Sequence, residues 1–137
     1  MRFMILIKSD ADTEAGLAPD QAVVAATGRY NEELVRAGVL LAAEDLLPSS
    51  RGFLVRFSGH ATEVAAGPFP APSSLVAGFW LLEVDTRQEA VEWVRRMPNP
   101  TGTDFEIEIR QVATADDVHA AMREQEEYLR AQIATNR

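Results

Sequence analysis

The sequence predicts one α+β domain with mostly antiparallel strands, because two different periodicities alternate along its 137 residues. Apolar and polar side chains alternate at residues 53–57 and 105–110, as in strands with one solvated face. Apolar side chains recur instead every three or four positions across residues 19–37 and 86–97, as in amphipathic helices. A chain of this length fits one domain with a sizeable core.

Strands are predicted wherever a short β-compatible run is closed by turn residues. These runs are residues 2–8, 39–42, 51–57, 60–64, 78–84 and 105–110. The third and fourth are expected to pair as a hairpin, because Ser58 and Gly59 between them favour a tight turn. A loop is expected at residues 66–72, because three prolines there remove backbone donors and exclude a central strand.

Three helices are predicted between and after these strands. The first spans residues 19–37, where Pro19 suits the opening turn and Gly38 provides a C-terminal cap. The second, residues 86–97, opens with a threonine and a glutamate at capping-box spacing. The third begins at Thr114 and extends for about 18 residues. Without this last helix, the order of elements is typical of a ferredoxin-like sandwich.

The C-terminal helix carries a narrow apolar stripe, formed by Val118, Met122, Gln125, Leu129 and Ile133. A helix with so thin a stripe usually packs on the surface of a neighbour. Two neighbours fit the pattern equally well, which are the helix's own domain and another subunit.

Composition excludes several classes of function. The chain contains no cysteine, so disulfides, thiolate metal sites and cysteine nucleophiles are excluded. Its formal net charge of −8 disfavours nucleic acids and anionic membranes as partners. The opening apolar run is too short for a signal peptide or a transmembrane span, so a cytoplasmic location is expected.

Two carboxylates and few other groups are candidates for chemistry. Glu44 and Asp45 lie at a predicted strand end, where a carboxylate that faces a cleft could act as a general base. His60 and His119 are expected to be exposed, and no metal site or cofactor is predicted from them. The serine pairs, which begin at Ser49 and at residue 73, have no base near them in the sequence, so serine hydrolysis is not supported.

Aromatic residues are the candidates for a ligand pocket. Tyr30 and Trp80 each combine an apolar body with one polar tip, which suits the wall of a small pocket and equally suits a core or an interface. Phe69 is flanked by prolines that would hold it on a rigid loop. Trp93 lies on an apolar helical pattern and is expected in the core or an interface.

Several runs, taken together and in order, resemble the YCII-related domain family and, within it, the DGPF branch. They are residues 29–34 (RYNEEL), 37–40 (AGVL), 44–48 (EDLLP), 67–69 (GPF), 78–84 (GFWLLEV), 88–93 (QEAVEW) and 108–112 (EIRQV). The resemblance implies a YCII-related ferredoxin-like domain over residues 1–112 and a helical extension over residues 113–137. It also implies a homodimeric α/β barrel with a cleft near the Gly67-Pro68-Phe69 loop.

The resemblance leads to three functional hypotheses. The Asp of the branch's Asp-Gly-Pro-Phe motif is replaced here by Ala66. The first hypothesis is therefore a non-catalytic dimer whose cleft binds a small ligand or a partner and is lined by Tyr30, Glu44, Gly67, Pro68, Phe69 and Trp80. The second is a small cofactor-free enzyme in which Glu44 or Asp45 is the general base and Tyr30 positions the substrate. The third is a regulatory protein with a sigma-factor-related partner, because members of the DGPF branch are often associated with such factors.

Overall fold

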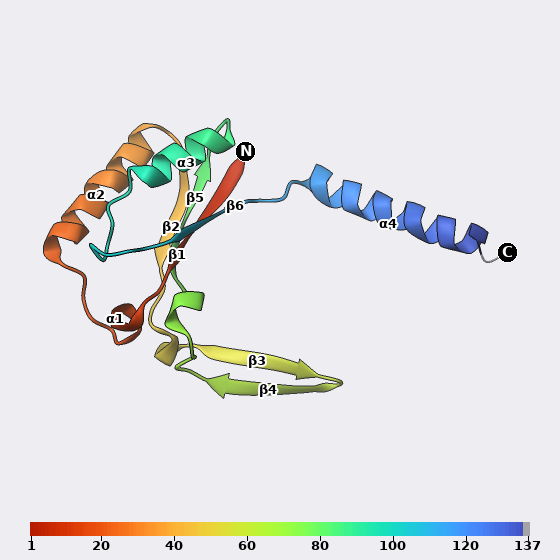
Figure 1. Cartoon of the computed structure of the whole chain (residues 1–137), viewed down its shortest axis with the longest axis horizontal. Coiled ribbons are helices and arrows are strands. Elements are labelled where there is room, and N and C mark those ends of the chain that lie inside the picture. The colour runs from red at the N-terminus through yellow and green to blue at the C-terminus, as the bar shows by residue number, and fades with distance from the viewer. Residues whose placement is uncertain (136–137) are drawn as a thin grey trace.

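The computed structural model describes residues 1–135, and its centre is a four-stranded antiparallel sheet. The strands are β1 (Arg2–Lys8), β2 (Leu40–Asp45), β5 (Val76–Glu83) and β6 (Ile107–Gln111), in the spatial order β2-β5-β1-β6. Helices α2 (Gln21–Arg36) and α3 (Arg87–Arg95) cover one face of this sheet (Figure 1). The predicted α+β, ferredoxin-like arrangement is therefore confirmed.

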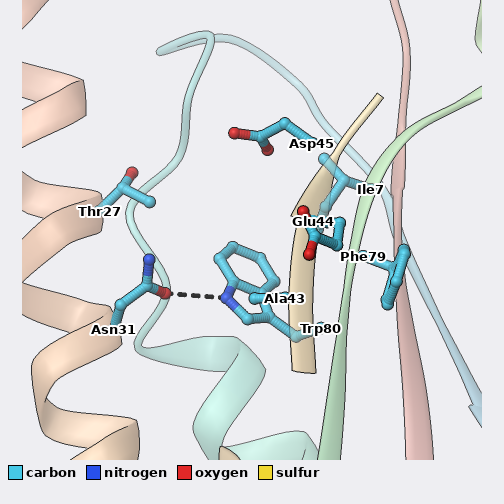
Figure 2. A pocket seen from close by; sticks show the side chains of 8 residues that line it. All are labelled: Ile7, Thr27, Asn31, Ala43, Glu44, Asp45, Phe79 and Trp80. Atoms are coloured by element: carbon cyan, nitrogen blue, oxygen red, sulfur yellow. Dashed lines mark hydrogen bonds between the residues drawn. The ribbon is translucent and has the colours of Figure 1, made fainter. Parts of the chain in front are cut away.

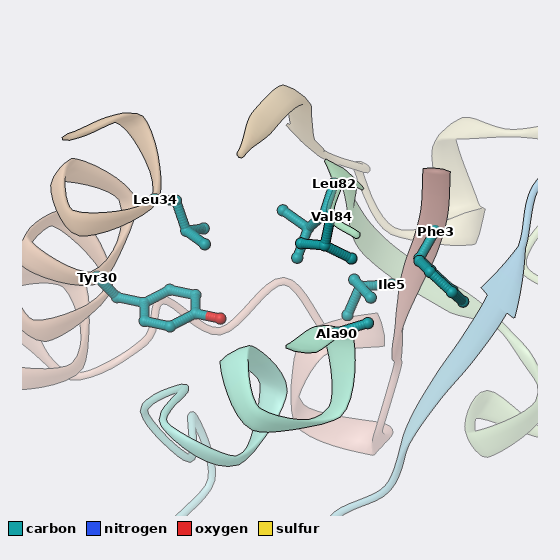
Figure 3. Close-up of a cluster of buried hydrophobic side chains, with 7 residues drawn as sticks. All are labelled: Phe3, Ile5, Tyr30, Leu34, Leu82, Val84 and Ala90. Carbon is teal, nitrogen blue, oxygen red and sulfur yellow. The ribbon is translucent and has the colours of Figure 1, made fainter. Parts of the chain in front are cut away.

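The core lies between this face of the sheet and the two helices, as Figure 3 shows. Alternation along β1 directs Phe3 and Ile5 towards the helices, and Leu82 of β5 meets them from the neighbouring strand. Leu34 of α2 and Ala90 of α3 close the cluster and are fully buried. Burial of these apolar side chains is the main force that holds the helices on the sheet.

The caps predicted at Gly38 and Thr86 are present, whereas the first helix begins at Gln21 and not at Pro19, after an Asp20 cap that was not predicted. The side chain of Asp20 accepts a hydrogen bond from the backbone N–H of Ala22 at the start of α2, and Gly38 follows its end with a φ of 73°. At the start of α3, Thr86 accepts from the backbone N–H of Glu89 at 3.1 Å. Each cap satisfies a backbone group that the helix itself leaves unpaired.

Two further local predictions need correction. Residues 9–12, expected as a turn only, lead into the short helix α1 (Ala11–Glu14), whose first turn is capped by Asp10 at 2.7 Å from the backbone nitrogen of Thr13. A helix of four residues is too short to show a periodicity in the sequence. Strand β2 also continues to Asp45, where a loop was expected after residue 42.

In the described part of the chain, no helix covers the other face of the sheet (Figure 1). Its centre is apolar and half-buried, and consists of Met4, Leu6, Phe79 and Leu81. Lys8 and Arg110 both bond the carboxylate of Glu108 at its margin, each at 3.2 Å. The hydrogen bonds from Arg110 and Lys8 hold the pKa of Glu108 below its usual value.

Two elements project from the sheet on this uncovered side (Figure 1). One is a two-stranded hairpin of β3 (Phe53–Ser58) and β4 (Ala61–Ala66), which we call the hairpin arm. The other is α4 (Ala115–Thr135), which we call the helical arm. None of its residues is buried, so the alternative in which this helix docks on its own domain is wrong. Residues 136–137 of the predicted extension lie outside the described range. Among residues 1–135, no helix has the length and hydropathy needed to span a bilayer.

Tyr30 is expected to make the folded protein less stable in alkali. Burial raises the pKa of its hydroxyl from 10.0 to about 12. Between about pH 10 and pH 12 the unfolded chain releases this proton while the folded chain retains it, so the free energy of unfolding falls by up to about 2–3 kcal/mol. Urea unfolding across this range should show a smaller decline for Tyr30→Phe. Tyr128→Phe, on the exposed helical arm, should decline as the wild type does, and an equal decline in all three proteins would contradict the prediction.

Candidate functional site

The end of β2 borders a pocket of about 190 Å³, which lies between the edge of the sheet and α2 (Figure 2). It is lined by Ile7, Thr27, Asn31, Ala43, Glu44, Asp45, Phe79 and Trp80. Three of the residues singled out in the sequence, Glu44, Asp45 and Trp80, therefore lie in one pocket. We call this the carboxylate pocket.

Strand pairing explains how the two adjacent carboxylates reach this pocket. Asp45 pairs with Gly78 of β5, and Glu44 pairs with Phe79, so the two side chains leave opposite faces of β2. Both can line the pocket because β2 is an outer strand of the sheet. A Cβ at position 78 would lie 3.1 Å from Oδ1 of Asp45, so the glycine leaves room for this carboxylate.

Trp80 is held in place from the α2 side. Its indole N–H donates to Oδ1 of Asn31 at 2.8 Å (Figure 2). This bond uses the amide oxygen of Asn31, so both N–H groups of the amide are available as donors on the pocket side. Tyr30 packs edge-on against Trp80, with ring centroids 5.6 Å apart.

Tyr30 itself does not line either pocket described here, although it was predicted as a ligand-binding residue. It is 5% exposed, and its hydroxyl donates to the backbone carbonyl of Trp93 at 2.7 Å. Tyr30 therefore contacts Trp80 from the core and helps to fix the position of its ring. Trp93 packs partly buried against the core, as expected.

Two residues that line the carboxylate pocket were not predicted from the sequence. Asn31 and Thr27 are four positions apart on α2, so they share one face of the helix. That spacing is a signal that the sequence contains. The spacing indicates a pocket only when the fold is known, because Trp80 and the end of β2 then lie opposite this face.

A second pocket of about 460 Å³ adjoins the first, and Asp45 lines both. The second pocket is lined by Glu14, Asp45, Leu46, Leu47, Pro48, Ser49, Arg51, Gly52, Phe69, Leu75 and Val76. Phe69, which was predicted to line a cleft, lies in the wall of this pocket. Gly67 and Pro68, which were also predicted as ligand-binding residues, are not among the lining residues of either pocket.

Ser49 ties the Phe69 loop to α1. Its hydroxyl donates to Oε2 of Glu14, and its backbone N–H donates to Oε1 of the same carboxylate at 3.0 Å. The hydroxyl oxygen in turn accepts the backbone N–H of Phe69 at 2.9 Å. No base lies near Ser49 in the sequence, and the fold brings Glu14 to it from 35 residues away.

Histidines and metal ligands contribute nothing to these pockets. His60 lies at the turn of the hairpin arm and His119 on the helical arm, and both are exposed as predicted. Within residues 1–135, no group of three or more His, Asp or Glu side chains is arranged to hold a metal ion. The chemistry available in the carboxylate pocket is therefore that of two carboxylates, an amide, a hydroxyl and an indole.

Comparisons with known proteins agree with this fold. A family model described as the YCII-related domain matches residues 1–114. An uncharacterised protein of Rhizobium meliloti (strain 1021) is 27% identical over 94 residues, which cover 69% of this chain and 76% of that protein.

A solved structure is also similar. It is a 5-chloro-2-hydroxyhydroquinone dehydrochlorinase from Burkholderia phenoliruptrix AC1100, in complex with 2,5-dihydroxybenzoquinone. The TM-score is 0.50 at 15% sequence identity, and the match covers 85% of this chain and 97% of that one. At this identity the similarity shows the fold alone.

Proposed function

The chain belongs to the YCII-related domain family, and from this premise we propose that it is a homodimeric protein that binds a small ligand in the carboxylate pocket without transforming it. The observation that carries the proposal is the meeting of Glu44, Asp45 and Trp80 in one pocket. The replacement of the motif's Asp by Ala66 supports binding without catalysis.

The lining of the pocket favours a small planar ligand that carries hydrogen-bond donors. Glu44 and Asp45 offer carboxylate oxygens as acceptors, while Asn31 offers amide donors. Trp80 supplies aromatic surface for a ring. A hydroxylated aromatic ring has these properties, and the similar structure from Burkholderia phenoliruptrix is named for a substrate of this kind.

The uncovered face of the sheet supports the homodimer. Met4 and Leu6 of β1 lie beside Phe79 and Leu81 of β5 on this face. An apolar sheet face of this kind is normally covered in a folded protein. A second copy packed face to face would cover it and form the α/β barrel that the resemblance implies.

Hydroquinone is the probe that tests the ligand-binding proposal. In a titration followed by NMR, the indole Hε1 signal of Trp80 is expected to shift and saturate, while that of Trp93 shifts little. Glu44→Gln and Asp45→Asn should each weaken binding about tenfold or more, because hydrogen bonds to charged groups contribute about 1.5–3 kcal/mol. Glu63→Gln, on the exposed hairpin arm, is the matched control and should bind as the wild type does.

Two results would refute this proposal. One is a Trp80 signal that stays unchanged up to millimolar hydroquinone. The other is equal affinity in the wild type and both pocket variants. A titration with 1,4-dimethoxybenzene, which has no donors, should give much weaker binding and so separates hydrogen bonding from aromatic packing.

A second candidate is a cofactor-free enzyme in which Glu44 or Asp45 acts as a general base. It is favoured by the carboxylates' position beside an aromatic wall and by the enzymatic activity named for the similar fold. Tyr30 would act in it only through Trp80, because the Tyr30 hydroxyl is bonded to the carbonyl of Trp93. Chloride release from 5-chloro-2-hydroxyhydroquinone that is lost in Glu44→Gln or Asp45→Asn would establish this candidate over binding alone.

The sigma-factor-related partner and the cytoplasmic location stay predictions.

A further inference from the structure

The hairpin arm has one apolar face that nothing in the described chain covers. Cross-strand pairing places Phe53, Val55 and Phe57 of β3 on the same face as Val64 of β4. Phe53 is 69% exposed and Phe57 82% exposed. The opposite face of the arm is mixed, because the pair Arg56 and Glu63 lies there beside Leu54 and Ala65.

The helical arm has an apolar stripe that the described chain also leaves uncovered. Val118, Met122, Leu129 and Ile133 lie along one side of α4 and are between 51% and 59% exposed. The stripe is about 22 Å long at the rise of an α-helix. The six-residue strands of the hairpin arm reach about 20 Å, so the two apolar surfaces match in length.

Each arm lacks what the other provides. A two-stranded hairpin is marginally stable in water on its own and needs a further strand or a packed helix. The two phenylalanines of the hairpin arm alone leave roughly 300 Å² of side-chain surface exposed, which is the size of the largest apolar patch on many monomers. The two arms of one chain project separately from the sheet (Figure 1), so a chain does not cover its own hairpin arm with its own helical arm.

We propose that the helical arm of one copy packs on the apolar face of the hairpin arm of a second copy, and that the second copy does the same in return. A two-fold axis repeats any such contact, so one interface covers both arms of both copies. The contact is continuous with the homodimer proposed above, on which it rests, because both arms project on the uncovered side of the sheet (Figure 1).

Other occupants fit less well. A coiled coil between two helical arms would place Gln125 in the middle of a seam only about two heptads long, and would leave both hairpin arms bare. An anionic membrane surface is disfavoured by the formal charge of −8. A second copy carries both matching surfaces.

The absence of cysteine from the sequence allows a direct test by cross-linking. A full-length chain with Val55→Cys is mixed with an affinity-tagged full-length chain with Leu129→Cys, and bismaleimidoethane is added. We expect a mixed cross-linked dimer as the main product. Glu63→Cys replaces Val55→Cys in the matched control, because Glu63 lies on the opposite face of the hairpin arm, and little mixed product is expected there.

Sedimentation of the same full-length chain provides the second measurement. The double variant Met122→Ser, Leu129→Ser is expected to raise the dimer dissociation constant at least tenfold. Glu127→Ser, on the other side of the helical arm, should leave it unchanged.

Each alternative outcome overturns the inference. Cross-linking of Leu129→Cys chains mainly with each other would indicate a coiled coil of helical arms. A stable dimer without the mixed product would refute the contact and leave the homodimer standing. A monomer at all concentrations would refute the contact and the homodimer together, while hydroquinone binding at Trp80 would still be measurable by itself.

Discussion

Replacing Gly67 with alanine is expected to lower the free energy of unfolding by about 3 kcal/mol, because the structure has no room for a methyl group there. A Cβ on this residue would lie 2.6 Å from the carbonyl carbon of Ser49 and still closer to its oxygen. Both obstructing atoms are backbone, so neither can rotate away. The backbone N–H of Gly67, which donates to the carbonyl of Gly52 at 3.0 Å, would be displaced as well.

Urea unfolding of Gly67→Ala against the wild type measures this effect. Gly28→Ala is the matched control, because Gly28 lies within α2 and a Cβ there meets nothing within 4 Å. Alanine in a helix is favoured over glycine by roughly 0.5–1 kcal/mol, so this control should be slightly more stable than the wild type. Equal stability of Gly67→Ala and wild type would show that the backbone at Ser49 can move.

Replacing Leu34 with alanine is expected to cost about 2–5 kcal/mol of stability. Leu34 is 0% exposed and lies between α2 and the sheet, where its loss leaves a cavity among Ile5, Leu82 and their neighbours. Since α2 also presents Asn31 and Thr27 to the carboxylate pocket, the variant should also weaken hydroquinone binding.

The neighbouring Val35 provides the comparison for Leu34. It is 64% exposed, so Val35→Ala should change the unfolding free energy by less than about 0.5 kcal/mol. Thermal and urea unfolding of both variants check this pair. A loss of stability in Val35→Ala as large as that in Leu34→Ala would contradict the placement of the core.

Most of the fold could be predicted because its signals are local. Three examples are the alternation of apolar and polar side chains that predicts β6, the threonine that caps α3 and the glycine that follows α2. Each depends on residues within a few positions of one another. The short helix α1 was not predicted, because its four residues contain barely one helical turn. The end of β2 was set too early because its last two residues are acidic and look like a loop.

The candidate site could be predicted only in part, because a pocket depends on which face of each element is turned inward. Glu44, Asp45 and Trp80 were identified from residue type and position, and they do meet. Tyr30 has the same amphipathic character as Trp80, yet its hydroxyl finds a partner in the core. The contact between Glu14 and Ser49 joins residues 35 positions apart, and no sequence spacing indicates it.

The position of Asp45 on the wall shared by the two pockets has a thermodynamic consequence. A ligand in the carboxylate pocket that attracts the Asp45 side chain withdraws part of the lining of the second pocket. Occupation of the carboxylate pocket by such a ligand is therefore expected to change the affinity of the second pocket, and by linkage the change is the same in both directions. A ligand of this kind in one pocket is therefore expected to weaken binding in the other.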